Sequence, residues 1–286
     1  DAMPERVIDV GIAEQHALTA AAGMAYAGLH PVVALYATFL NRAFDQVLMD
    51  VGLHGAGVTI VLDRAGLTGT DGASHNGMWD MALFSLVPGL RLAAPRDERT
   101  LREALRIAVG VDDGPTIVRY PKGALPGPLP EVRTVGDDGD EGPFGAVDVL
   151  LEAAGEGPGG PLLLVGVGAM VPATLEAGRA LVARGEAVTV ACPRWVVPVP
   201  RALVDLAASA RGVVVVEDGL VEGGVGSRLR DALEDGAAGG GARPVVARVG
   251  VPRRFVATAE RSQLLADFGM DAAGIERTAL GLGRRS

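Results

Sequence analysis

The chain has 286 residues, of which 26 are Lys or Arg and 35 are Asp or Glu, so its formal net charge is −9. This acidic balance argues against nucleic acid as a partner, because phosphate backbones are bound by clustered Lys and Arg side chains. The single cysteine, Cys192, excludes an internal disulfide bond and a zinc site with several cysteines, as expected for a protein of the reducing cytoplasm.

Residues 17–40 contain no Asp, Glu, Lys or Arg, which is long enough for a membrane span on length alone. Gly28, His30 and Pro31 divide this stretch into a helix and a strand, and no basic segment followed by an apolar core marks a signal peptide. We therefore expect neither a membrane span nor a membrane partner.

The first part of the chain predicts alternating strands and helices. The β-branched run Val7–Val10 predicts a short buried strand, and Gly11 allows a turn into a helix. That helix carries Glu14 in its first turn and continues through the Ala-rich residues 17–28. The apolar residues 31–38 then predict a buried parallel strand.

A helix that starts near Asn41 has one apolar stripe, and the strand predicted at 57–66 leads into a Gly-rich polar loop at 67–77. Loops at the carboxyl ends of parallel strands are where α/β folds place their sites. The stripe consists of Phe44, Val47, Leu48 and Val51. The elements predicted after the loop are a helix at 78–87, a strand at 90–95, a helix at 98–109 and a strand at 115–121.

Residues 123–145 are dominated by Gly, Pro, Asp and Glu and are predicted to be a linker. Beyond the linker, four apolar runs alternate with helical segments, which predicts a second, smaller sheet with helices. The predicted strands lie at 162–170, 186–196, 212–218 and 244–250, and the helices lie at 174–183, 202–210, 226–233 and from Ser262 onward.

Four segments of the first part carry a resemblance to a known family: AEQHALTAAAG at 13–23, PVVALYATFLNRAFDQV at 31–47, DRAGLTGTDGASHNG at 63–77 and VRYPKG at 118–123. They closely resemble the 1-deoxy-D-xylulose-5-phosphate synthase family, which belongs to the transketolase-like thiamine diphosphate enzymes. CPRWV at 192–196 and VVVVEDGLVEGGVGS at 213–227 resemble the last domain of the same family more weakly.

The resemblance implies an α/β fold with an incomplete pyrimidine-binding domain at 1–122, the linker at 123–145 and a smaller transketolase C-terminal domain at 146–286. Family members are longer and begin with a further domain, and this chain starts with Asp1, so we expect it to be a fragment. Members are homodimers, and the Ala-rich helix after Glu14 is a plausible dimer face.

The activity implied by the resemblance is a thiamine diphosphate-dependent transfer. Pyruvate is decarboxylated and its two-carbon unit is joined to D-glyceraldehyde 3-phosphate, in the biosynthesis of isoprenoid precursors, thiamine and pyridoxal. The Mg²⁺ and diphosphate ligands of the family belong to the missing N-terminal domain. We therefore expect no metal ligands in this chain, and no activity of the fragment alone.

The site residues follow from the same resemblance, residue by residue. Glu14 matches the carboxylate that faces N1′ of the aminopyrimidine, and Phe39 matches the aromatic residue that stacks on that ring. Six further residues match positions on the substrate side: Tyr36, Arg42, Arg64, Asp71, His75 and Lys122, with His75 also a candidate catalytic residue. Without the resemblance, Glu14 would be interpreted as a charge at a helix start and Phe39 as a core residue.

Two departures from the family pattern stand in this region. Lys122 occupies the place of an Arg, which removes bidentate recognition of a phosphate, and SHNG at 74–77 replaces THHG or THQG. Arg64 and Lys122 both follow strands and could converge on a phosphate, although surface cations with no such role are commoner. His16, two residues after Glu14 on the helix, does not face it and is assigned a structural role or a role in supporting the site from behind its lining residues.

Three questions stay open at this point. The cluster Gly223–Ser227 ahead of a helix could hold an anion or could simply pack closely. The chain could belong to another transketolase-like enzyme, such as a 2-oxoacid dehydrogenase β-subunit, although AEQHA and DRAGLTGTDG favour the synthase family. It could also be a non-catalytic module kept for dimerisation.

Overall fold

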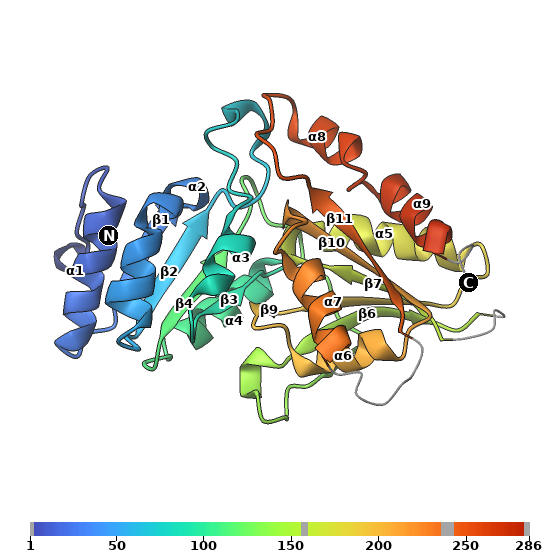
Figure 1. Cartoon of the computed structure of the whole chain (residues 1–286), viewed down its shortest axis with the longest axis horizontal. Helices are drawn as coiled ribbons and strands as arrows, with labels where there is room; N and C mark the ends of the chain where they lie inside the picture. The colour runs from blue at the N-terminus through green and yellow to red at the C-terminus, as the bar shows by residue number, and fades with distance from the viewer. Residues whose placement is uncertain (1–2, 156–159, 236–242, 283–286) are drawn as a thin grey trace.

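Two β-sheets lie side by side in the computed structural model, which describes residues 3–155, 160–235 and 243–282 (Figure 1). The first sheet has the order β1-β2-β4-β3-β9, in which β1 to β4 are parallel and β9 is antiparallel to β3. The predicted α/β class is thereby confirmed. The strands are β1 (Val32–Tyr36), β2 (Val58–Asp63), β3 (Arg91–Ala93), β4 (Pro115–Arg119) and β9 (Trp195–Val197).

Helices cover both faces of the first sheet. Helix α1 (Glu14–Tyr26) packs with its Ala-rich side against the π-helix η3 (Gln46–Gly52) and against β1 and β2. Helix α4 (Glu98–Ala108) covers the opposite face, and Asp97 caps it by accepting a hydrogen bond from the Thr100 backbone N–H at 2.8 Å. The short helices are α2 (Ala37–Leu40), η2 (Asn41–Ala43), η4 (Gly69–Asp71), α3 (Asp80–Leu83) and η5 (Phe84–Leu86).

The second sheet has the order β11-β10-β7-β8-β6-β5 and lies between two layers of helices. Helices α5 (Val171–Val182) and α9 (Ala272–Leu282) cover one face, whereas α6 (Arg201–Ala208) and α7 (Val225–Asp235) cover the other. Its strands are β5 (Arg133–Val135), β6 (Val147–Ala153), β7 (Leu162–Gly166), β8 (Val188–Pro193), β10 (Gly212–Leu220) and β11 (Val245–Val251). Helix α8 (Arg261–Asp267) precedes α9, so the predicted final helix is divided in two.

Three predictions about these elements were wrong. Val7–Val10 forms no strand, because it pairs with no neighbour and leaves Val7 78% and Ile8 65% exposed. Strand β1 is parallel as predicted but lies at the sheet edge, where Val32 and Tyr36 remain exposed instead of buried. The second sheet is the larger one, because β6 was not predicted and β5 lies inside the predicted linker.

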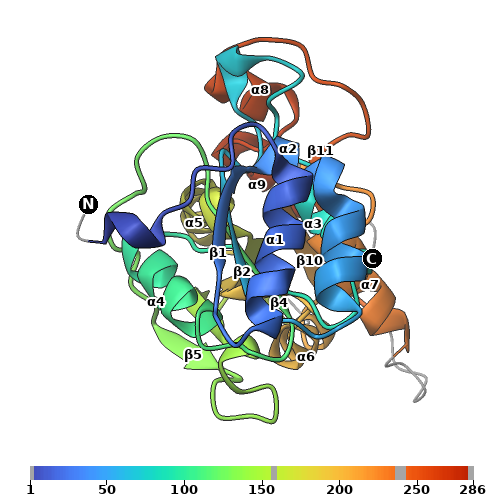
Figure 2. The same cartoon turned by 90° about the vertical axis from the view of Figure 1, so that its left-hand side faces the viewer.

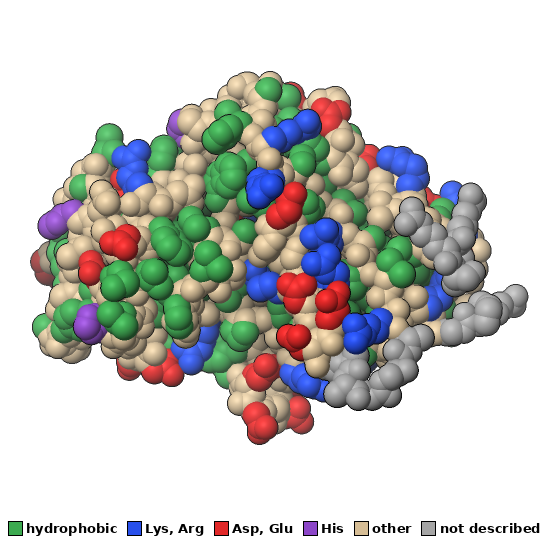
Figure 3. Space-filling view, in the orientation of Figure 1, with side chains coloured by type: hydrophobic (Ala, Val, Ile, Leu, Met, Phe, Trp, Pro, Cys, Tyr) green, Lys and Arg blue, Asp and Glu red, His purple; other side chains and the backbone are tan. Residues whose placement is uncertain are grey.

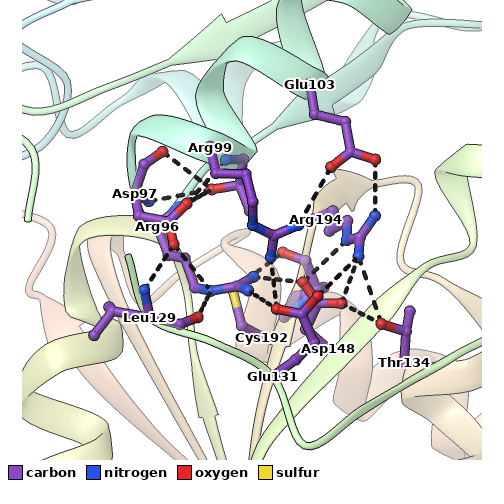
Figure 4. A network of polar contacts seen from close by, with 12 residues as sticks. Arg96, Asp97, Arg99, Glu103, Leu129, Glu131, Thr134, Asp148, Cys192 and Arg194 are labelled. Carbon is purple, nitrogen blue, oxygen red and sulfur yellow. Dashed lines mark hydrogen bonds and ion pairs between the residues drawn. The ribbon is translucent and has the colours of Figure 1, made fainter. Parts of the chain in front are cut away.

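The two halves of the chain interlock at two places. Strand β9, which comes from the second half, adds to the first sheet and buries Trp195 there. Around Asp148, at the start of β6, Arg96 and Arg194 form a network of ion pairs, with Arg96 Nη1 at 2.5 Å and Arg194 Nη2 at 2.8 Å from its carboxylate oxygens (Figure 4). Because Arg96 lies just after β3 and Asp148 on β6, this network ties the two sheets together.

The solvent-exposed surfaces of the two halves differ in character. Figure 2 looks onto the face formed by α1 and β1. Four apolar residues in or next to α1, β1 and η3 are more than half exposed: Ile12, Tyr26, Val32 and Leu53. Figure 3, which has the orientation of Figure 1, shows hydrophobic side chains gathered over the first half of the chain and charged side chains over the second half. No helix among the described residues is long and apolar enough to cross a membrane.

The glycine cluster Gly223–Ser227 is closed by a side chain of the protein itself. The carboxylate of Glu217, on β10, accepts hydrogen bonds from the backbone N–H groups of Val225 at 2.8 Å and Gly226 at 3.0 Å. An internal carboxylate thus occupies the N-terminus of α7, where the sequence left open whether the glycines hold an anion or simply pack closely. Burial raises the pKa of Glu217 to about 7, although both hydrogen bonds and the charges of Arg228 and Arg119 oppose this shift.

We predict that Glu217 makes the stability of the fold depend on pH. Its pKa is about 7 in the folded chain and 4.5 in an unfolded one, so the folded state binds more protons between these values. The free energy of unfolding therefore falls as pH rises through this window, by on the order of 3 kcal/mol for this one group. Glu217→Gln keeps an acceptor for one of the two N–H groups, has no ionisable proton and should remove this contribution. Urea unfolding of the wild-type protein and of Glu217→Gln at several pH values between 4.5 and 8 measures this contribution. If the free energy of unfolding changed with pH in the same way in both proteins, the prediction would be contradicted.

Candidate active site

The carboxyl ends of three neighbouring parallel strands border one cavity of about 500 Å³. Tyr36 ends β1 and stands in register with Asp63, which ends β2, while Tyr120 directly follows β4. This is the edge of a parallel sheet at which α/β proteins bind ligands. The lining residues are Gly11, Ile12, Glu14, Ala34, Leu35, Tyr36, Phe39, Arg42, Asp63 and Tyr120.

Glu14 is the buried acid of this cavity. It is the first residue of α1 and is only 6% exposed. Its Oε2 atom is buried and has no hydrogen-bond partner among the described residues, and its nearest cation, Arg42 Nη1, lies 3.7 Å away. An unpaired buried carboxylate oxygen is costly unless a ligand pairs with it. Glu14 is thus suited to share a proton with a ring nitrogen placed in the cavity.

The aromatic wall beside Glu14 is formed by Phe39 and Tyr36. Their rings are stacked at a centroid distance of 5.7 Å and an interplanar angle of 11°. The ring of His75 meets Phe39 edge-on at 5.5 Å, and the Arg64 guanidinium lies 3.9 Å from the centroid of the Tyr36 ring. Phe39 is partly exposed at the cavity, so the prediction that it lies at the site and not in the core is consistent with this geometry.

Arg64 is held in a constrained conformation. It has a φ of 59°, a backbone region that non-glycine residues rarely adopt, and its guanidinium forms an ion pair with Asp63 while it stacks on Tyr36. The next residue is fixed as well, because the Ala65 backbone N–H donates to the Tyr120 carbonyl oxygen at 2.9 Å. The strained turn therefore directs the Arg64 side chain back over the cavity wall.

Asp71 and Lys122 form a second charged pair next to this wall. Lys122 Nζ lies 2.6 Å from Asp71 Oδ1, and this hydrogen bond lowers the pKa of the Asp71 carboxyl, with the charges of His75 and Arg64 acting in the same direction. Lys122 is the only lysine in the sequence. Both cations expected to converge on a phosphate, Arg64 and Lys122, are therefore paired with a carboxylate of the chain itself.

The structure thus brings the sequence-predicted residues into two adjoining groups. Glu14, Tyr36, Phe39 and Arg42 line the cavity directly. Arg64 and His75 contact its aromatic wall, and Asp71 with Lys122 lies behind His75 and Arg64. His16 is exposed on α1 and does not belong to either group.

Among the polar residues that line the cavity, sequence reasoning assigned no role to two. Asp63 and Tyr120 both line it, and burial together with the charge of Asp63 raises the pKa of the Tyr120 hydroxyl, which keeps that hydroxyl a hydrogen-bond donor. The available signal was their position at the last residue of one strand and just after another, which places both at the carboxyl edge of the sheet. Among the described residues, no group of three or more His, Cys, Asp or Glu side chains could hold a metal ion.

Comparison with known proteins places both halves of the chain. Residues 1–128 match the family described as "Transketolase, pyrimidine binding domain", and residues 152–275 match "Transketolase, C-terminal domain". A solved structure titled "Split gene transketolase, inactive beta4 tetramer" superposes with a TM-score of 0.78 at 28% sequence identity, covering 98% of this chain and 85% of that one. The architecture described above is therefore that of transketolases.

Two curated relatives refine this placement. The chain is 54% identical to the 1-deoxy-D-xylulose-5-phosphate synthase of Kocuria rhizophila and 53% identical to 1-deoxy-D-xylulose-5-phosphate synthase 2 of Streptomyces avermitilis. In each case the match covers 98% of this chain and 41% of the relative's length. These matches favour this branch over the other thiamine enzymes considered. The chain therefore belongs to the 1-deoxy-D-xylulose-5-phosphate synthase family of transketolase-like enzymes.

Proposed function

We propose that a protein containing this chain decarboxylates pyruvate on thiamine diphosphate and joins the two-carbon unit to D-glyceraldehyde 3-phosphate. The product would serve the biosynthesis of isoprenoid precursors, thiamine and pyridoxal in the cytoplasm. The observation that carries this proposal is the buried Oε2 of Glu14, which has no hydrogen-bond partner among the described residues and lies at a cavity walled by Phe39. A module kept only for dimerisation would gain nothing from leaving this atom without a hydrogen bond.

The residues of the cavity fit the pyrimidine end of the cofactor. A flat ring needs an apolar face and a polar group at one ring nitrogen, and the cavity offers the Phe39 ring and the Glu14 carboxylate. When bound, thiamine diphosphate supplies a nucleophilic carbon, C2, that also accepts the electron pair left by the departing carbon dioxide. The protein's task is to place that carbon and to control protons around it.

In this proposal Glu14 holds a proton at N1′ of the pyrimidine, and its burial excludes the water that would otherwise compete for that proton. Phe39 fixes the orientation of the ring by stacking. The nearby Arg42 remains largely exposed, which leaves its guanidinium available to an anionic group at the mouth of the cavity. These roles need only side-chain positions already present in the chain.

The second group of residues is assigned to the substrates. Tyr36, Arg64, Asp71, His75 and Lys122 would face the reacting carbons and the acceptor's phosphate, with His75 moving a proton at a substrate oxygen. The two cations suit an anionic substrate, and the paired carboxylates hold them in place before it arrives. We assign the acceptor's phosphate to Lys122 and Arg64 together.

The wider organisation is proposed on the same basis. The pyrimidine-binding unit would comprise residues 1–122 and the C-terminal unit residues 146–286, joined through 123–145, and the bounds of the two family matches support this division. Mg²⁺ and the diphosphate would be held by residues outside this chain. We further propose a homodimer that uses the face of α1, where Tyr26 is 56% exposed, together with Ile12 just before this helix, which is 91% exposed.

The first test concerns Glu14. In a full-length protein that carries this chain, Glu14→Gln should still bind the cofactor, because the amide keeps the size and the hydrogen bonding of the acid. It lacks the ionisable proton, so hydrogen–deuterium exchange at C2 of bound thiamine diphosphate should slow by about 10²–10⁴-fold. Proton NMR after acid quench measures the exchange, and calorimetry measures the affinity. If exchange proceeded at the wild-type rate, Glu14 would be interpreted only as a charge at the start of a helix.

The second test concerns Lys122. If Lys122 binds the acceptor's phosphate, Lys122→Ala in the same protein should raise the KM for D-glyceraldehyde 3-phosphate by about tenfold or more and leave the KM for pyruvate nearly unchanged. Lys122→Arg is the matched control and should be tolerated, because it keeps the charge and the reach toward Asp71. An equal loss toward both substrates would indicate a structural role.

The third test uses these 286 residues alone. The charged diphosphate and its metal provide most of the anchoring of the cofactor, and we place their ligands outside this chain. We therefore expect no synthase activity and only weak binding of thiamine diphosphate, with a Kd well above the micromolar range. Isothermal titration with and without Mg²⁺ decides the matter. Micromolar, Mg²⁺-dependent binding would show that this chain holds the diphosphate itself.

A further inference from the structure

The loop Leu67–Gly77, which carries Asp71 and His75, rests on the second half of the chain. Figures 1 and 2 both show it beside α8, although the two segments are nearly two hundred residues apart in the sequence. A Cβ added at Gly69 would lie 2.9 Å from the backbone nitrogen of Arg261, and one added at Gly72 would lie 2.9 Å from the Thr258 hydroxyl. The loop therefore lies directly against the backbone at the start of α8 at Gly69, and against the Thr258 side chain ahead of α8 at Gly72.

Arg261, the first residue of α8, makes the polar contact across this boundary. Its Nε donates a hydrogen bond to the Leu67 carbonyl oxygen at 2.9 Å. Among the described residues, the backbone of residues 67–72 is hydrogen-bonded to one residue outside the loop, and that residue is Arg261. The other backbone bonds of this stretch run within the loop, from the Thr68 N–H to the Asn76 side chain, from the Gly72 N–H to the Gly69 carbonyl and from the His75 N–H to the Gly72 carbonyl.

Arg261 is itself fixed to the frame of the molecule. Its Nη2 lies 3.8 Å from Oδ2 of Asp218 on β10, and Asp218 is fully buried. Asp218 Oδ1 in turn accepts a hydrogen bond from Arg119 Nη1 at 2.7 Å, at the end of β4. Arg261 thus connects the loop to the point where the two sheets are joined by buried charges.

We propose that Arg261 is a positioning residue: by holding the Leu67 carbonyl from α8, it fixes the loop so that Asp71 can pair with Lys122 and His75 can meet Phe39. The C-terminal part of the chain thereby sets the geometry of the substrate side of a site whose cavity is built by the first part. The link to substrate rests on the function proposed above. The positioning itself rests on contacts within the chain.

Two substitutions of equal length separate the hydrogen bond from other effects. Arg261→Gln places an amide nitrogen where Nε stands, so it can still donate to Leu67, whereas Arg261→Met fills the same space without a donor. Both remove the charge near Asp218. A difference between them therefore reports the Leu67 hydrogen bond alone. Arg254→Ala is the control for charge loss on the same segment, because the Arg254 guanidinium lies over the Phe268 ring, 5.4 Å from its centroid.

The chain offers a selective reporter of the result. Because Lys122 is the only lysine, labelling with ¹³C-lysine gives one set of signals, and Asp71→Asn defines their position when the ion pair is broken. We expect Arg261→Met to shift the lysine signal toward that of Asp71→Asn and to speed amide exchange of residues 67–77 by about tenfold or more, with the sheets unaffected. Arg261→Gln and Arg254→Ala should stay near wild type.

In a full-length protein, the same variants should change the binding of the acceptor substrate and leave the proton exchange of the cofactor unaffected. Arg261→Met should raise the KM for D-glyceraldehyde 3-phosphate several-fold and leave Glu14-dependent exchange at C2 of the cofactor unchanged. Should Arg261→Met fail to fold, Gly69→Ala disturbs the same contact from the loop side and should give the same lysine shift. Wild-type lysine signals and loop exchange in the folded variant, or equal changes in Met and Gln variants, would overturn the inference. Neither outcome depends on whether the Glu14 test succeeds.

Discussion

The structure depends above all on one buried cation. Arg119, at the end of β4, donates to Asp80 on α3 at 2.6 Å and to Asp218 on β10 at 2.7 Å. Burial alone would lower the pKa of this guanidinium, but the charges of Asp218 and Asp80 raise it instead, so it stays charged. Removing one partner of such a pair typically costs 3–5 kcal/mol, because a buried charge is left alone. The two halves are therefore held in one relative position, which packing of apolar surfaces alone would define less sharply.

This constraint explains how a site built on one sheet can depend on the other. The chain leaves Arg119 and immediately supplies Tyr120 to the cavity and Lys122 to the pair with Asp71. Because Arg119 is fixed from both sides, that short segment has little freedom. The opposite wall begins at Glu14 on α1, which is fixed by packing against η3 and the first sheet. The Glu14 side and the Lys122 side of the site thus obtain their rigidity from different sources, one from close apolar packing and one from buried charge.

The periodicity of apolar residues predicted most of the fold. It failed where the structure is decided by the pairing of strands that lie far apart in the sequence. The strands that became β2 and β4 and the helices that became α1 and α4 carry strong local patterns, and their ends were predicted to within about three residues. The run Val7–Val10 carries an equally good strand pattern yet pairs with nothing in this structure. Strand β9 pairs with β3, which lies about a hundred residues earlier in the chain, and β5 consists of three residues within a Gly- and Pro-rich stretch. No local signal distinguishes these cases, since partner choice is a tertiary property.

For the site, the sequence supplied the residues through resemblance, and the structure supplied their charge balance. Arg64 and Lys122 were expected as two cations awaiting a phosphate, whereas each is already paired, with Asp63 and Asp71 respectively. Spacing along the chain could not reveal this, because Asp71 and Lys122 meet only through the fold. Because paired cations are already held in place, the binding of an anionic substrate costs less side-chain conformational entropy. The same pairing weakens the electric field that the substrate meets, compared with the field of two free charges. Recognition at such a site should therefore come from geometry more than from net charge, and a lysine, which acts as a point charge, can serve where its carboxylate partner fixes its position.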